Sequence, residues 1–72
     1  MAKSELSNEI RRLRFEHGEM TQQDLADRAM LTLQTINAVD AGRYLPSLLL
    51  AFRIARVFDV AVDDLFHWNG KS

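Results

Sequence analysis

The chain is 72 residues long and contains no cysteine, which excludes disulfide bonds and thiolate metal sites. Nine lysines and arginines stand against ten aspartates and glutamates, and this balance argues against a domain that holds nucleic acid by bulk positive charge. No apolar run approaches the roughly 20 residues of a membrane-spanning helix, and the opening MAKSELSNEIRR lacks the apolar core of a signal peptide. We therefore expect one cytoplasmic domain without membrane contact, with a core over residues 5–67 and tails at 1–4 and 69–72.

The first predicted helix runs from about Glu5 to His17. Its apolar residues Leu6, Ile10 and Leu13 recur at the spacing of one helix face. Gly18 follows and is expected to end this helix.

Residues 21–44 carry the start and stop signals of two short helices. Thr21 with Asp24, and then Thr32, are candidate N-terminal caps, and Gly42 can adopt the left-handed conformation that ends a helix. Two helices joined by a tight turn make a helix-turn-helix, whose second helix fits the major groove of DNA. The spacing alone indicates the helical pair but does not establish DNA binding, because many helical domains contain such a pair.

The second half of the chain contains two further predicted helices. Ser47 is a candidate N-cap for a helix over about 48–58, while Asp63 and Asp64 suit the positive end of a last helix over about 62–67. No strand pattern interrupts this order, so the prediction is a compact all-α domain of five helices. The longer helix is expected to bury the face formed by Leu48, Ala51, Ile54, Ala55 and Phe58.

Several segments, in order, resemble one family. They are NEIRRLRFEHGEMTQQDLADRA, QTINAVDAGRYLPSL and IARVFDVAVDDLF, which together span roughly residues 8–67. They resemble the Cro/phage-repressor-like (XRE-type) helix-turn-helix regulators, in particular the small stand-alone bacterial and archaeal members. The resemblance implies a five-helix, lambda-repressor-like fold that binds double-stranded operator DNA, usually as a two-fold dimer on a palindromic site. It also implies a partly buried ion pair between Arg14 and Asp40, which would tie the first helix to the end of the third.

The same resemblance assigns DNA contacts to the third helix and its surroundings. Gln22 would reach a phosphate from the start of the second helix, and the outer side of the third helix would face the bases. The loop after the third helix would flank the DNA backbone. The implied DNA-binding residues are Gln22, Thr32, Leu33, Gln34, Thr35, Asn37, Ala38, Arg43 and Tyr44.

Two of these assignments have independent physical support. Gln34 and Asn37 are three residues apart, so they project from one helix face, and either amide could make a paired contact with adenine. Taken alone, such residues are more often solvated surface than base readers. The surrounding motif favours base contact.

Three residues depart from the family pattern. Leu33 stands where a polar base reader is common, which leaves it balanced between an apolar DNA contact and a contact with protein. Ala38 is too short to reach a base edge well. Met30 lies in a turn that usually contains glycine, where a positive φ would cost about 1 kcal/mol.

Apolar residues towards the C-terminus exceed what five short helices can comfortably bury. A contiguous exposed apolar patch usually marks a partner surface, so we expect a homodimer. The alternative is a monomer in which Trp68 folds back onto its own core. The expected interface residues are Leu49, Phe52, Leu65, Phe66 and Trp68.

The sequence shows no catalytic or metal-binding constellation. His17 and His67 lack clustered ligands, and Asp63 with Asp64 is better explained by the helix dipole than by acid–base chemistry. We expect no enzymatic activity and no cofactor. The favoured function is a homodimeric helix-turn-helix transcriptional regulator. The alternative is a protein-interaction module, such as an antitoxin-like subunit that binds a protein partner, which Leu33, Ala38 and the net acidity favour.

Overall fold

Residues 6–68 are described by a computed structural model, in which five helices are accompanied by two short strands. The five predicted helices are confirmed, although the first and last are shorter than predicted. The elements in chain order are β1 (Leu6–Asn8), α1 (Ile10–Glu16), α2 (Gln22–Ala29), α3 (Leu33–Asp40), α4 (Leu48–Phe58), α5 (Val62–Leu65) and β2 (Phe66–Trp68).

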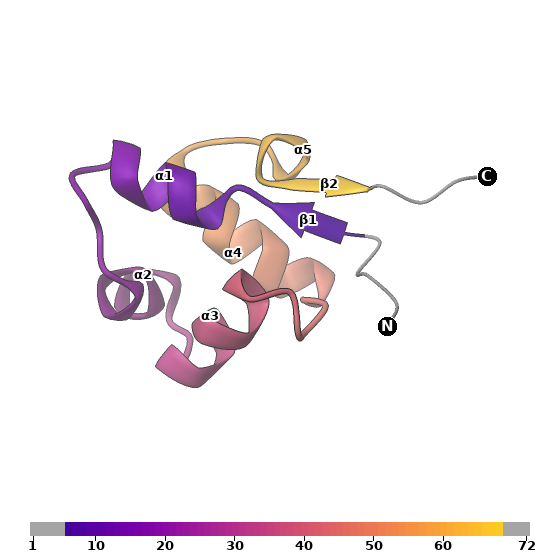
Figure 1. Ribbon diagram of the computed structural model, residues 1–72, viewed down its shortest axis with the longest axis horizontal. Coiled ribbons are helices and arrows are strands. Elements are labelled where there is room, and N and C mark those ends of the chain that lie inside the picture. Colours follow the sequence, from indigo (N-terminus) through magenta and orange to yellow (C-terminus); the bar gives the residue numbers. More distant parts are fainter. Residues whose placement is uncertain (1–5, 69–72) are drawn as a thin grey trace.

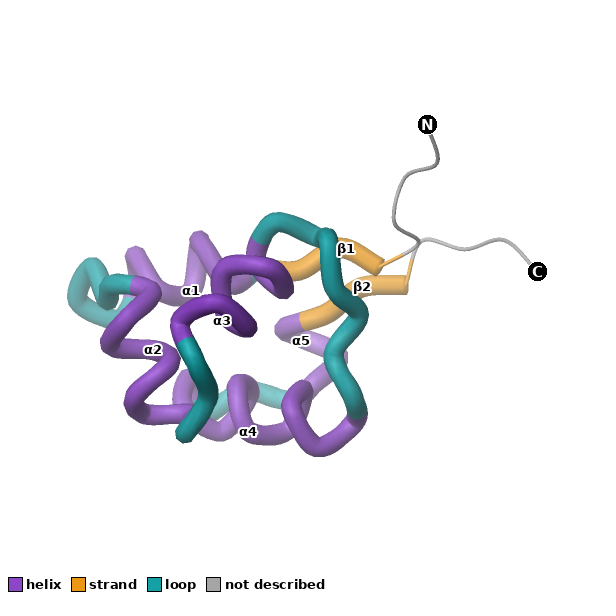
Figure 2. The backbone as a smooth tube through the Cα atoms, turned by 90° about the horizontal axis from the view of Figure 1, so that it is seen from below, coloured by secondary structure: helices purple, strands orange, loops and turns teal. Residues whose placement is uncertain are grey.

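The longest helix, α4, is the element against which much of the molecule packs. It contacts α2 and α5, and Figure 1 shows it passing behind α1 and α3. The two strands lie at the opposite end of the molecule from α2, as Figures 1 and 2 both show. The buried residues of α4 follow the spacing i, i+3, i+4, i+7 and are Ala51, Ile54, Ala55 and Phe58.

One residue predicted for the buried face of α4 lies outside the core. Leu48 is the first residue of the helix and is exposed. A helical side chain covers the turn before its own Cα, so that of Leu48 lies towards the preceding loop and not over the core. The predicted cap at Ser47 is confirmed, since its hydroxyl accepts a hydrogen bond from the Leu50 N–H at 3.2 Å.

The two strands were not predicted. They are the first and last elements of the described chain, and they add a small sheet to the predicted helical fold. β1 and β2 pair antiparallel, with Leu6 opposite Trp68 and Asn8 opposite Phe66. Strands of three residues are too short to show an alternating pattern, and their partners lie at opposite ends of the chain. The aromatic residues of β2 suit a strand, which explains why the last helix ends at Leu65.

Asn8 explains why α1 begins at Ile10 and not at Glu5. Its Oδ1 accepts a hydrogen bond from the Ile10 N–H at 3.0 Å, and its Nδ2 donates to the Val39 carbonyl at 3.0 Å. The side chain therefore stops the helix from extending backwards and joins β1 to the end of α3. The segment before it is left free to pair with β2.

The turn between α2 and α3 contains a residue with a positive φ, the conformation for which the sequence analysis expected a cost at Met30. Met30 ends α2 with φ 59° and ψ 45°, and its side chain is 74% exposed. Its N–H bonds to the carbonyls of Ala26 and Asp27, which satisfies the end of the helix. Gly42, after α3, also has positive φ, as predicted. Within residues 6–68 no helix has the length and apolar character that a membrane crossing requires.

Candidate nucleic-acid interface

Local capping fixes the start of both helices of the helix-turn-helix. Thr21 Oγ1 accepts from the Asp24 N–H at 2.9 Å, while Asp24 Oδ2 accepts from the Thr21 N–H at 3.3 Å. Thr32 Oγ1 likewise accepts from the Thr35 N–H at 3.1 Å. Both predicted N-caps are therefore confirmed, and α2 packs against α3.

α3 has one buried and one open side. Ile36 and Val39 are buried in the core, whereas Leu33, Gln34 and Asn37 are exposed. Thr35 and Ala38 are half-buried at the margin of the open side. The described part of this protomer therefore leaves the outer side of α3 open to a binding partner.

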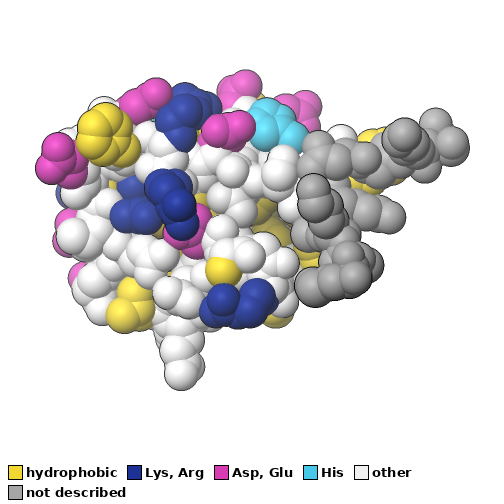
Figure 3. Space-filling view, in the orientation of Figure 1, with side chains coloured by type: hydrophobic (Ala, Val, Ile, Leu, Met, Phe, Trp, Pro, Cys, Tyr) yellow, Lys and Arg dark blue, Asp and Glu magenta, His cyan; other side chains and the backbone are white. Residues whose placement is uncertain are grey.

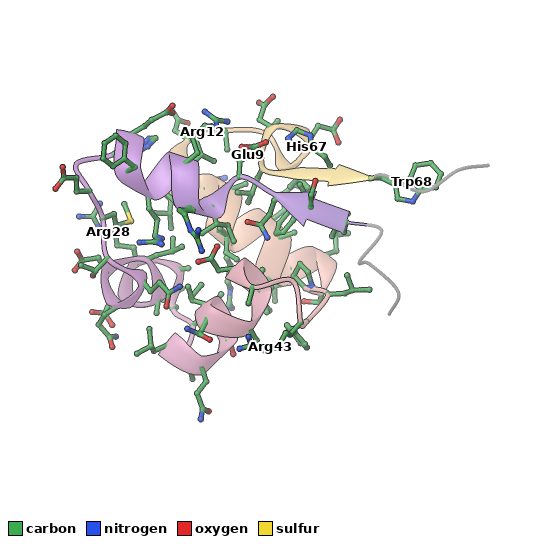
Figure 4. The ribbon with its side chains drawn as sticks, viewed as in Figure 1. Glu9, Arg12, Arg28, Arg43, His67 and Trp68 are labelled. Carbon is green, nitrogen blue, oxygen red and sulfur yellow. The ribbon has the colours of Figure 1, made fainter. Side chains whose placement is uncertain are left out.

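Charge is unevenly distributed over the face shown in Figure 3. Acidic side chains gather along its upper and left edges, whereas the lower edge, over α3, shows none. Blue side chains lie there instead, and Figure 4 labels Arg43 beside α3. An anionic duplex would therefore meet the least acidic part of this face.

Four polar side chains form a continuous hydrogen-bonded chain beside α3. Arg43 Nη2 donates to Asn37 Oδ1 at 2.9 Å, and Asn37 Nδ2 donates to Gln22 Oε1 at 3.1 Å. Gln22 Nε2 then donates to Asp40 Oδ2 at 2.8 Å. We call Arg43, Asn37, Gln22 and Asp40 the amide chain. It joins the loop after α3 to α3 itself and to the first residue of α2.

The inner end of the amide chain is anchored by an ion pair. Arg14 Nη2 lies 3.7 Å from Asp40 Oδ2, and the two side chains are only 17% and 6% exposed. Arg14 Nη1 also donates to the Met20 carbonyl at 2.8 Å. The structure thus contains the partly buried pair that the family resemblance implied. It links α1 to α3, and through Gln22 to α2.

The amide chain holds Asn37 in place without using all of its hydrogen-bonding capacity. An amide has two N–H donors and two lone pairs, and Asn37 uses one of each within the chain. One donor and one acceptor remain, which is the pair that an adenine edge requires. Gln34 differs, since its side-chain amide makes no hydrogen bond to any residue between 6 and 68.

Sequence reasoning missed the amide chain, although it contained a partial signal. Asn37 and Asp40 are three residues apart on α3, and Gln22 is the first residue of α2. That spacing places Asn37 and Asp40 on one stripe of the helix. Only the packing of α2 against α3, which joins residues 15 and 18 positions apart, shows that Gln22 reaches both.

The residues expected at a dimer interface fall into two groups. Leu65 and Phe66 are buried in the core of the protomer, which corrects their assignment to a surface. Leu49, Phe52 and Trp68 are exposed, and Trp68 does not fold back onto the core but points away from it at the end of β2 (Figure 4).

The exposed apolar surface on α4 extends further than the sequence predicts. Leu48, at the start of α4, and Leu45, in the loop before it, are also exposed. We call Leu45, Leu48, Leu49 and Phe52 the α4 apolar patch. Isolated exposed leucines need no explanation, but four exposed apolar side chains gathered at the start of α4 and in the loop before it indicate a contact surface.

Comparison with known proteins shows the family to which the chain belongs. Residues 10–65 match the family described as Helix-turn-helix. An uncharacterized HTH-type transcriptional regulator of Methanocaldococcus jannaschii is 43% identical over 61 residues, or 85% of this chain and 91% of that protein. Another from Methanothermobacter thermautotrophicus is 50% identical over 58 residues, or 79% and 83% of the two chains.

A solved structure shares the fold at lower sequence identity. A candidate DNA-binding protein from Bacteroides fragilis, known from a crystal structure, is 22% identical with a TM-score of 0.73. The match covers 86% of this chain and 98% of that one. At this identity the likeness supports the fold alone.

Proposed function

Because the chain belongs to the helix-turn-helix family and is a transcriptional regulator with a helix-turn-helix DNA-binding domain, we propose that α3 reads operator bases in the major groove. The observation that carries this proposal is the state of Asn37. Its amide is fixed by two neighbours and retains one donor and one acceptor on the open side of α3. Fixing a side chain before binding reduces the entropy lost on contact.

Asn37 and Gln34 are the base readers in this proposal, with Leu33 and Thr35 beside them. Leu33 is 43% exposed and offers an apolar contact suited to a thymine methyl. The half-buried Ala38 has a side chain too short to read a base, and it would only allow α3 to lie close to the DNA. Thr32 acts mainly through its cap, which fixes the first turn of α3.

Phosphate contacts would position the reading helix. Gln22 lies at the first turn of α2, where unpaired backbone N–H groups attract anions. Arg43 and Tyr44 are exposed in the loop after α3 and can donate to a second phosphate. Arg43 also holds Asn37, so a phosphate bound by Arg43 would influence the orientation of the base-reading amide.

A homodimer on a palindromic operator completes the proposal. The α4 apolar patch, together with Trp68, supplies the surface by which two protomers would associate. Two-fold pairing would then place the reading helices about 34 Å apart, one turn of DNA.

The test begins with selection of bound fragments from a random duplex pool, followed by affinity measurement on the selected site. Asn37→Ala is expected to weaken specific binding by about 1–3 kcal/mol and to leave non-specific binding unchanged. Gln23→Ala is the matched control, because this exposed amide on α2 bonds only to Asp27. Equal losses on specific and random duplexes would show that Asn37 does not read bases.

A second function, that of a protein-interaction module such as an antitoxin-like subunit, is favoured by one observation. Leu33 exposes an apolar side chain at the centre of the proposed DNA surface of a chain with net charge −1. Gel-shift assays on random duplexes at low salt separate the two functions. Absence of binding there would favour the protein partner.

A further inference from the structure

Three arginines that lie outside the proposed DNA surface surround one surface hollow. The hollow has a volume of about 370 Å³ and lies between the end of α2 and the second half of α4. Its lining contains no acidic residue and none of the residues proposed to contact DNA. It is formed by Arg28, Ala29, Met30, Arg53, Arg56 and Val57.

Within residues 6–68 two arginines form ion pairs, and the three around the hollow do not. Arg12 pairs with Glu9 and Glu16, and Arg14 pairs with Asp40. Arg28, Arg53 and Arg56, by contrast, form no ion pair with any residue in the range 6–68. Three like charges around one hollow repel one another, and an anion would relieve that repulsion.

Helix dipoles account for two of the three arginines but not for the third. Arg28 and Arg56 lie in the last turns of α2 and α4, where a cation is favourable. Arg53 lies in the middle of α4 and is half-buried, so neither the helix dipole nor an ion pair within residues 6–68 accounts for its charge. Arg53 is therefore the residue that most strongly indicates a ligand.

The other walls of the hollow are apolar. Ala29 is buried, Val57 is half-buried, and Met30 stands at the rim with its side chain exposed. Met30 also holds a left-handed backbone conformation, a strain of the kind that collects at binding sites. Guanidinium groups bind phosphate through paired hydrogen bonds, and the hollow has the size of a small-molecule site.

We propose that this hollow binds small phosphate monoesters. The phosphate would lie on Arg28, Arg53 and Arg56, and an apolar substituent would rest against Met30 and Val57. The inference does not rest on DNA binding by α3. Figure 4 shows Arg28 on α2 well apart from Arg43.

The experiment is a two-dimensional ¹H–¹⁵N NMR titration of the full chain with phenyl phosphate, inorganic phosphate and phenol at constant ionic strength. Phenyl phosphate is expected to shift the amides of Arg28, Met30 and Val57 and to bind more tightly than either of the other probes. Arg53→Gln and, separately, Arg28→Gln are expected to weaken phenyl phosphate at least about fivefold. Circular dichroism establishes that each variant is folded.

Arg11→Gln is the matched control, because Arg11 is an exposed arginine of α1 that does not line this hollow. It is expected to change the affinity less than about twofold, since it removes the same charge at a distance. An equal loss in Arg11→Gln, or shifts spread over all arginines, would show general anion attraction and overturn the site. Equal affinity for phenyl phosphate and inorganic phosphate would overturn the proposed ester class.

A second measurement, of binding to duplex DNA, distinguishes a small-ligand site from a second DNA contact. Arg53→Gln is expected to leave binding to a random duplex within about twofold of the parent, whereas Arg43→Gln weakens it. If Arg53→Gln weakens duplex binding as much as Arg43→Gln does, and phenyl phosphate causes no shifts, the arginines serve the DNA backbone and the proposal fails. Failure of α3 to bind DNA would leave the phenyl phosphate result unaffected.

Discussion

At the scale of single residues, the turn between α2 and α3 contains a strained backbone conformation. Met30 adopts a left-handed conformation that costs a residue with a Cβ roughly 1 kcal/mol. Its exposed side chain packs little within the protomer, so little offsets that cost. The turn therefore keeps its geometry at the expense of stability.

Met30→Gly is expected to stabilise the fold by about 0.5–1 kcal/mol, because glycine adopts positive φ without steric penalty. Chemical denaturation measures the change. Met30→Ala is the control, since it removes the side chain but keeps the Cβ and should stay within about 0.5 kcal/mol of the parent. A gain in Met30→Ala equal to that in Met30→Gly would mean that the side chain, and not the backbone, is responsible.

At the scale of elements, Glu9 connects the strands to the first helix. Glu9 Oε1 accepts from Arg12 Nε at 2.9 Å, and Oε2 lies 3.1 Å from His67 Nε2 of β2 (Figure 4). The hydrogen bond from Arg12 is the main cause that lowers the pKa of Glu9 below its ordinary value of 4.5. The ionised carboxylate is therefore favoured by folding.

The sign of the resulting pH dependence follows from that lowered pKa. The contribution of Glu9 to stability is fully present above pH 4.5 and is lost as the pH falls through the pKa of the folded protein. We expect Glu9→Gln to unfold at lower urea than the parent at pH 7, with a gap that closes below pH 4.5. Glu19→Gln, an exposed residue without an ion pair among the described residues, should show no such trend. A gap that stays constant down to pH 3 would contradict the prediction.

The elements also show which features can be predicted from sequence. α2 and α3 were predictable because Thr21 with Asp24, and Thr32 with Thr35, form their caps within three residues. The β1–β2 ribbon was not, because its pairing joins Leu6 to Trp68 and leaves no local pattern. The family resemblance implies a DNA contact for Gln22, which stays a prediction, and its partners Asn37 and Asp40 depend on how α2 packs on α3.

At the scale of the whole molecule, one surface would bind DNA and another would join two protomers. The outer side of α3 carries the amides, while the α4 apolar patch and Trp68 carry exposed apolar side chains. A domain of this size has a small core, so association that buries the patch would also stabilise it. DNA affinity would then depend on protein concentration.

Phe52→Glu is expected to weaken the proposed dimer at least about tenfold, because a carboxylate would be buried in an apolar contact. Phe15→Glu is the matched control, since Phe15 is also an exposed phenylalanine and lies on α1, outside the patch. Analytical sedimentation over a range of concentrations measures both. If the parent remains a monomer throughout, or if both variants dissociate alike, the patch is not the interface.

The ribbon that joins β1 to β2 has a topological consequence. Since Leu6 faces Trp68, the segment between them is a nearly closed ring with a gap at one place. Circular permutants, in which a short peptide bridges that gap and the chain is opened at an exposed turn, should keep the fold. Opening between α1 and α2 would leave the helix-turn-helix uninterrupted. The helices would then be synthesised in a different order while the folded architecture stays the same.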